Sequence, residues 1–204
     1  MNYYNRKILP KLMDSSMATP DLMRLRRKLL AQVHGQVLEI GMGGGHNLAC
    51  YPPGIRQITA VDVHSELIQT AVDRAQQVGI TVDYHPVSAE RLPFAGECFD
   101  SVVSTWTLCS IPDVNQALEE IHRVLRPGGD IFFIEHGLSP DAKIRTWQNR
   151  LTPLQKFFSG GCHLNRDIPA LLRDAGFTIK ELQTFYLKDT PRISGYSFMG
   201  TASK

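Results

Sequence analysis

Short apolar runs alternate along most of the chain with stretches in which apolar residues recur every three or four positions. The short runs predict strands at residues 37–40, 58–63, 81–87, 99–105 and 131–136. The stretches between them predict helices, and the clearest covers residues 114–125, with Leu118, Ile121 and Leu125 on one face. Strands that alternate with helices predict a parallel sheet with helices on both faces.

The pattern differs at the two ends of the chain. Residues 3–13 and 20–33 predict two helices before the first strand. After Asp141 the pattern predicts a helix that carries Trp147, a helix over 166–175, and two last strands over 177–187 and 194–202. We therefore predict an N-terminal helical segment over 1–34 and one α/β domain over 35–204, long enough to bury a sizeable core.

A glycine-dense turn follows the first predicted strand. Residues 37–40 lead directly into Gly41-Met42-Gly43-Gly44-Gly45, and Asp62 stands at the end of the next strand, about twenty residues later. Open α/β sheets bind nucleotides beyond the carboxyl ends of their strands, where glycines allow close backbone approach and an acidic side chain accepts from ribose hydroxyls. The turn therefore predicts an adenosine-type cofactor.

Two common nucleotide motifs are absent from this turn. The dinucleotide fingerprint Gly-x-Gly-x-x-Gly/Ala fails because His46 occupies its third position. No Gly-Lys-Ser/Thr follows, which excludes a P-loop. A nicotinamide oxidoreductase is therefore disfavoured, although it shares the opening strand, turn and acidic residue.

The motif Glu39-x-Gly41-x-Gly43-x-Gly45, followed by segments 88–94, 99–103 and 123–129, resembles the class I S-adenosylmethionine (SAM) methyltransferases of the type 11 domain. The resemblance covers residues 36–137 most strongly. It implies SAM as cofactor and a Rossmann-like, doubly wound, mostly parallel seven-stranded sheet. The last two strands would form a hairpin with one antiparallel strand at the sheet edge. In the Arg-Pro-Gly-Gly segment, Pro127 is predicted to end the helix, and the glycines to permit a sharp reversal into the strand at 131.

The resemblance also implies how SAM is bound. Backbone N–H groups from Gly41 to Gly45, beside a short helix that starts near His46 or Asn47, would suit the carboxylate of the methionine end. Glu39 would organise the loop or accept from the amine through water, and Asp62 would bind the ribose hydroxyls, its alternative role being a helix N-cap. The predicted cofactor residues are Glu39, Gly41, Met42, Gly43, Gly45, Asp62, Val63, Ser88, Ala89, Glu90, Thr105 and Trp106.

Two parts of this site leave alternatives open. The family often has an acidic residue where Ser88 stands, so adenine recognition falls to the Ala89 amide, the Ser88 hydroxyl or an apolar clamp. Residues 104–109 should line the methyl-transfer end, where Trp106 either contacts the cofactor or packs in the core.

Composition and charge bear on the expected partners, metal sites and location of the protein. The net charge of +2 without a basic run predicts no nucleic-acid partner. The cysteines lack a C-x-x-C pair and any metal-ligand spacing, so no metal site is predicted, and their scatter is typical of a cytoplasmic protein; they are Cys50, Cys98, Cys109 and Cys162. No apolar stretch approaches the roughly 18 residues of a membrane span, and no signal peptide is visible.

Segments outside the cofactor motifs bear on the acceptor. They resemble the mammalian microsomal alkyl thiol methyltransferases and their bacterial relatives, and comprise 51–54, 108–110, 135–137 and 160–162 with Trp147, Arg150 and Arg166. The resemblance implies a small, apolar acceptor, with a thiol favoured. A lipid or quinol acceptor and a non-catalytic SAM-binding protein are the alternatives.

Methyl transfer to sulfur requires alignment and exclusion of water more than a base, because a thiol is partly ionised at neutral pH and strongly nucleophilic. A hydroxyl acceptor would need a base. His136 is the best candidate, and its alternative is a structural histidine bonded to backbone. His46 and His163 are weaker candidates, while Cys109 and Cys162 are interpreted as small buried residues.

The first predicted helix is partly apolar and also basic. It includes Ile8, Leu9 and Leu12 together with Lys7 and Lys11. We consider three roles for it: a lid over the acceptor pocket, weak association with a lipid surface, and packing on the sheet edge. The protein is expected to be a monomer or a homodimer.

Overall fold

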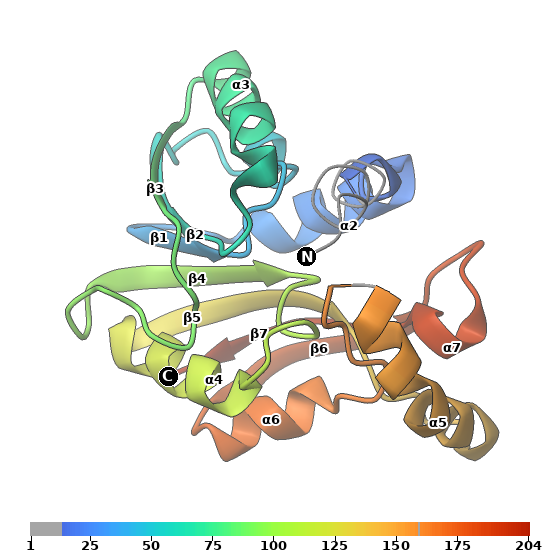
Figure 1. Ribbon diagram of the computed structural model, residues 1–204. Helices are drawn as coiled ribbons and strands as arrows, with labels where there is room; N and C mark the ends of the chain where they lie inside the picture. Colours follow the sequence, from blue (N-terminus) through green and yellow to red (C-terminus); the bar gives the residue numbers. More distant parts are fainter. Residues whose placement is uncertain (1–13, 159) are drawn as a thin grey trace.

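The computed structural model describes residues 14–158 and 160–204, which form one mixed sheet with helices on both faces (Figure 1). The strands are β1 (Val37–Ile40), β2 (Gln57–Val61), β3 (Thr81–His85), β4 (Phe99–Thr105), β5 (Leu125–His136), β6 (Thr178–Tyr186) and β7 (Tyr196–Ser203). They form a seven-stranded sheet in the order β3-β2-β1-β4-β5-β7-β6. Pairing is parallel from β3 to β5, whereas β7 is antiparallel to both of its neighbours. The predicted fold class is confirmed.

The central strands are buried on both faces, which is why their sequences are apolar without strict alternation. In β5, Ile131 and Phe133 face one core, while Phe132 and Ile134 face the other. The first core packs under α4 (Val114–Val124) and α6 (Ile168–Asp174), and the second under α2 (Pro20–Leu30) and α3 (Ile68–Val78). Figure 1 shows these two pairs of helices on opposite faces of the sheet.

Local capping explains where several helices begin and end. The side chain of Thr19 accepts from the Leu22 amide at the start of α2, and Asp113 caps α4 in the same way. Helix α3 ends at Gly79, whose left-handed φ of 68° suits glycine. Two further helices, α5 (Ala142–Phe158) and α7 (Arg192–Gly195), lie beyond β5 and before β7. The predicted helix over 3–13 lies outside the described residues.

The Arg-Pro-Gly-Gly segment does not form the predicted turn between a helix and a strand at 131. Helix α4 ends at Val124, and the chain pairs with β4 from Leu125 onward. Phe99 pairs with Leu125, but Ser101 pairs with Asp130. An advance of two residues along β4 therefore corresponds to an advance of five along β5. The glycines are therefore absorbed in an irregular bulge within one long strand. Leu125 is fully buried, which explains why pairing begins so early.

The C-terminal hairpin is present, but its antiparallel strand does not lie at the sheet edge as expected. Strand β7 inserts between β5 and β6, and β6 forms the edge. Every residue of β7 except its two ends is buried, whereas β6 is largely exposed. The more apolar strand therefore takes the inner position.

Candidate functional site

A cavity of about 600 Å³ opens at the carboxyl ends of β1, β2 and β4. All but one of the predicted cofactor residues line it: Glu39, Gly41, Met42, Gly43, Asp62, Val63, Ser88, Ala89, Glu90, Thr105 and Trp106. Gly45 is the exception, because a Cβ there would meet Leu48 and Ala71 on the protein side. The structure therefore brings the predicted residues together around one space, while their contacts with a cofactor stay a prediction.

Asp62 fastens the glycine loop to the end of β2. Its Oδ2 accepts from the Gly43 amide at 2.8 Å, and its Oδ1 accepts from the His64 amide at 2.8 Å. A Cβ added at Gly43 would have no atom within 4 Å, so the loop faces open space at this point. An ionised carboxylate has further lone pairs that could accept from ribose hydroxyls. Asp62 is not a helix N-cap, because α3 begins at Ile68.

The short helix predicted to start near His46 or Asn47 is present as a single 3-10 turn, η2 (Leu48–Cys50), with Asn47 as its N-cap residue. The Asn47 side chain points to Glu39 and Thr105 rather than capping a helix, and prolines follow at 52 and 53. Any anion bound here would therefore rely on loop amides without the dipole of a long helix.

Residues just before α2 contact the glycine loop through Arg74. Arg74 donates to the Gly44 carbonyl at 2.5 Å and to both carboxylate oxygens of Asp14 at 3.0 Å. Burial alone would raise the pKa of Asp14, but Arg74 and His46 outweigh it and hold the pKa below its usual value. Asp14 and Met17 both line the cavity. The N-terminal segment therefore reaches the cofactor side of the cavity, and its role as a lid stays a prediction.

Glu39 lies at the buried floor of the cavity, and both of its predicted roles stay predictions. Its carboxylate accepts from Tyr51 Oη at 2.7 Å and from Asn47 Nδ2 at 2.9 Å. Burial raises the pKa of Glu39 to about 7, although these hydrogen bonds and nearby Arg26 oppose the shift.

This raised pKa predicts a pH dependence of stability. The unfolded carboxyl ionises near 4.5 and the folded one near 7, so the free energy of unfolding should fall by about 3 kcal/mol as pH rises between these values. Glu39→Gln should remove this part of the decline. Urea unfolding of both proteins at pH 4.5 and 7.5 measures it, and parallel profiles for the two proteins would contradict the assignment.

Arg26 was not found from the sequence, although it holds one wall of the cavity. It is almost fully buried, donates to Asn47 Oδ1 at 3.1 Å and lies 4.7 Å from the centre of the Trp106 ring. Trp106 has a left-handed φ of 55°, unusual for an aromatic residue, and it both lines the cavity and packs against the second core. Nothing in the amphipathic pattern of α2 marks Arg26 for this contact.

The Ser88 hydroxyl is already engaged at the predicted adenine end. It donates to Glu90 Oε2 at 2.8 Å, and it accepts from the Glu90 amide at 3.2 Å. The other oxygen of Glu90 accepts from the Asp113 amide at 2.7 Å. These bonds favour the other two alternatives for adenine, the Ala89 amide or an apolar clamp.

The opposite part of the cavity, here called the acceptor end, is lined by Thr107, Ser110, Ile111, Pro112, Gly160 and Gly161. Glu135 binds the loop after β4 that carries several of these residues. The fully buried carboxylate accepts from the amides of Thr107, Leu108 and Cys109 at 2.9–3.2 Å and from Ser104 Oγ at 2.9 Å. Burial raises the pKa of Glu135 to about 8.

Arg166 holds the same loop from the other side. Its buried guanidinium donates to the carbonyls of Leu108, Ile111 and Pro112. A carboxylate that accepts amides and a guanidinium that donates to carbonyls thus satisfy the polar groups of a loop that has no secondary structure.

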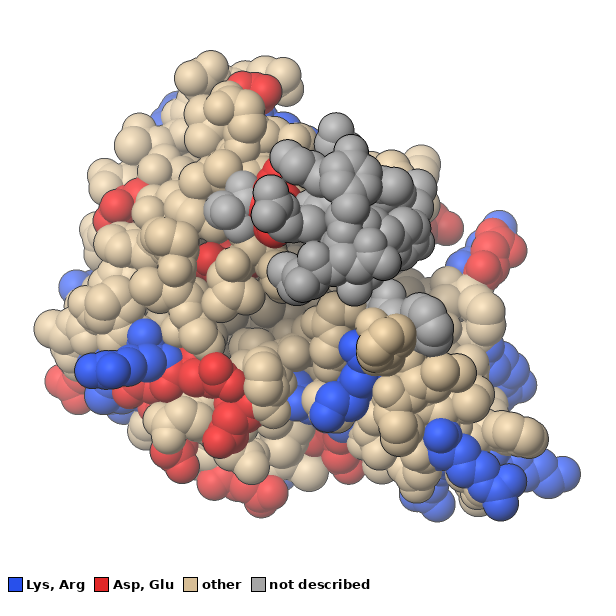
Figure 2. Space-filling view, viewed as in Figure 1, with Lys and Arg blue, Asp and Glu red and all other residues tan. Residues whose placement is uncertain are grey.

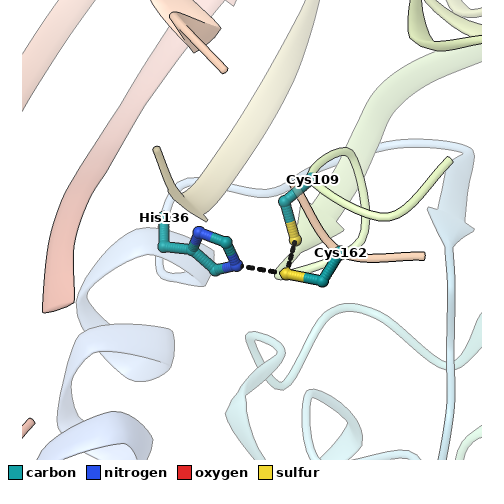
Figure 3. Close-up of side chains that lie close together, drawn as sticks. All are labelled: Cys109, His136 and Cys162. Atoms are coloured by element: carbon teal, nitrogen blue, oxygen red, sulfur yellow. Dashed lines mark hydrogen bonds between the residues drawn. The ribbon is translucent and has the colours of Figure 1, made fainter. Parts of the chain in front are cut away.

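His136 ends β5 as predicted, but it is not among the residues that line the cavity. Its Nε2 lies 2.6 Å from Cys162 Sγ, which in turn lies 3.8 Å from Cys109 Sγ (Figure 3). Burial opposes protonation of His136, but the Cys109 sulfur outweighs it and raises the pKa of the imidazole. Its predicted role as a base for a hydroxyl acceptor stays a prediction. His163 contacts the Cys109 carbonyl and His46 contacts Asp14.

Comparison with known proteins assigns the family. A family model described as "Methyltransferase domain" matches residues 38–133. Thiol S-methyltransferase TMT1B of Homo sapiens is 33% identical over 166 residues, which cover 75% of this chain and 67% of that protein. The chain belongs to the SAM-dependent methyltransferases. Their cofactor, S-adenosyl-L-methionine, is therefore the cofactor of this protein, and the assignment of the cavity to it stays a prediction.

Two further comparisons concern a second relative and the fold. Thiol S-methyltransferase TMT1B of Rattus norvegicus is 33% identical over 153 residues, which cover 72% of this chain but only 62% of that protein. A solved SAM-dependent methyltransferase from Aquifex aeolicus shares the fold with a TM-score of 0.65 at 17% identity, covering 96% of this chain and 98% of its own. In the part of this methyltransferase that the structure describes, no helix is long and apolar enough to cross a bilayer.

Proposed function

We propose that this protein transfers the methyl group of SAM to the sulfur of a small, apolar thiol. The observation that carries the proposal is the chemistry of the acceptor end. None of the described residues that line it has an ionisable side chain. A hydroxyl or amine acceptor would lack a positioned base there, whereas a thiol needs none. The similarity to proteins named thiol S-methyltransferases agrees with this acceptor.

The residues of the cavity suit the cofactor. When bound, SAM supplies a methyl group on a sulfonium, which a thiol sulfur attacks in line, releasing S-adenosylhomocysteine and a proton to solvent. Asp62 would accept from the ribose hydroxyls, and the loop at Gly43 would admit the methionine end. Trp106 and Arg26 line the cavity side by side, and they would help to exclude water from the reacting groups. Alignment of the two sulfurs is then the main contribution of the protein.

A turnover assay tests the acceptor. Purified protein with SAM should form S-adenosylhomocysteine and an equal amount of methyl thioether when an alkyl thiol is added, with only background product when the acceptor is omitted. The same assay with a quinol and with a phospholipid should give no product above background. Turnover with either of these and none with thiols would overturn the proposal.

A lipid-borne acceptor is the second candidate, and the surface of α5 favours it. Trp147, Leu154 and Phe157 are 54%, 57% and 74% exposed. Basic side chains gather over the same helix, at the lower right of Figure 2, and comprise Lys143, Arg145, Arg150 and Lys156. An apolar and basic helix face is typical of binding to anionic membrane surfaces. Helix α5 leads within a few residues to Gly160 and Gly161 at the acceptor end.

A further inference from the structure

Three side chains from separate segments meet behind the acceptor end. Cys109 lies in the loop after β4, His136 ends β5, and Cys162 follows α5 (Figure 3). Their sulfur and nitrogen atoms all lie within 4.8 Å of one another, and both cysteines are buried. The positions are far apart in the sequence, so no metal-ligand spacing was visible there. Thiolate and imidazole are the ligands that zinc prefers.

The separation of the two sulfurs matches a tetrahedral zinc site. With Zn–S bonds of about 2.3 Å and Zn–N bonds of about 2.0 Å, two sulfur ligands lie about 3.8 Å apart, and sulfur and nitrogen about 3.6 Å apart. The sulfurs of Cys109 and Cys162 are 3.8 Å apart, whereas His136 Nε2 is 2.6 Å from Cys162 Sγ. An ion would therefore fit between the sulfurs once the imidazole withdraws by about 1 Å.

Two buried side chains hold the loop beside the cluster. The loop that carries Cys109 is held by Glu135, next to His136, and by Arg166, four residues after Cys162. A zinc ion would neutralise the two thiolates that bind it.

We propose that Cys109, His136 and Cys162 bind a zinc ion whose fourth position takes an exchangeable ligand. Three protein ligands are the number found in zinc sites that keep an open position, whereas structural sites have four. Ser110 and Gly161 flank two of the ligands and line the acceptor end, and Ser110 Oγ lies 3.5 Å from Cys109 Sγ. Water or a thiol from the acceptor end can supply the fourth ligand. That a thiol can be the fourth ligand rests on the proposed function. When the thiol binds zinc, its S–H proton would pass to solvent.

Metal content tests the site. Protein purified under reducing conditions with zinc, then freed of loose metal, should hold one zinc per chain by elemental analysis. Cys162→Ser and His136→Asn should lose it, and Cys98→Ser, a cysteine outside the cluster, should keep it. Calorimetric titration with S-adenosylhomocysteine checks that every variant is folded. Wild-type protein that binds S-adenosylhomocysteine but no zinc would overturn the proposal, as would variants of the cluster that retain zinc.

Cobalt(II) substitution tests the open position. The cobalt protein should show cobalt–thiolate absorption, absent in Cys162→Ser, and adding 2-mercaptoethanol should change the ligand-field bands as it displaces water. Unchanged bands would refute an exchangeable fourth ligand. These results do not depend on turnover, so zinc binding without methylation of any thiol would instead contradict the proposed function.

Discussion

Glu135→Ala should lower the free energy of unfolding by about 4 kcal/mol at pH 7. The substitution leaves three buried backbone amides without an acceptor, those of Thr107, Leu108 and Cys109, and it leaves Ser104 without its partner. Each unsatisfied buried group costs about 1–3 kcal/mol. Urea unfolding followed by circular dichroism measures the loss.

Glu135→Gln is the matched variant, because it keeps one acceptor oxygen in a side chain of the same size. We expect it to lose about half as much stability as the alanine variant. The carboxyl of Glu135, with its pKa raised to about 8, is mostly protonated at pH 7, so the comparison measures hydrogen bonding more than charge. A loss below about 1 kcal/mol for Glu135→Ala would mean that water replaces the carboxylate.

Asp62→Ala should weaken binding of S-adenosylhomocysteine by about 1–3 kcal/mol, or roughly 5- to 150-fold. The change removes the proposed ribose acceptor and also releases the amides of Gly43 and His64, which shape the loop. Calorimetric titration measures the dissociation constant, with NADH as a second ligand that should not bind. An unchanged dissociation constant would refute the ribose assignment.

Two further variants separate binding from folding. Asp62→Asn keeps an oxygen that can accept one backbone amide but lacks the negative charge, so its affinity should fall between those of wild type and Asp62→Ala. Asp73→Ala removes a carboxylate on α3 that bonds only Gln69 among the contacts described, and it should bind normally. Loss of thermal stability in Asp62→Ala without loss of affinity would assign Asp62 a role in the loop alone.

The spacing of apolar residues predicted the fold class, because within each helix or strand it shows which side is buried. The apolar face of α4 indicates burial on one side, and the uninterrupted apolar run of β5 indicates burial on both. The bounds of both elements were predicted within a few residues, except for the bulge at the start of β5. The glycine turn and Asp62 were also found together, since parallel strands bring their carboxyl ends to one edge. The family resemblance, rather than periodicity, supplied SAM.

Tertiary packing alone decided the features that depend on partners far away in the chain. The order of β6 and β7 followed from which strand is buried more completely, and the short helix after the glycine loop is a single 3-10 turn beside which Asn47 bonds Glu39. Arg26 bonds Asn47, Glu135 bonds Cys109 and His136 contacts Cys162, and in each of these pairs the two residues stand 21 or more positions apart. Local pattern determines which face of an element is buried, but hydrogen bonds and metal ligands require specific atoms to meet, and only the folded chain brings them together.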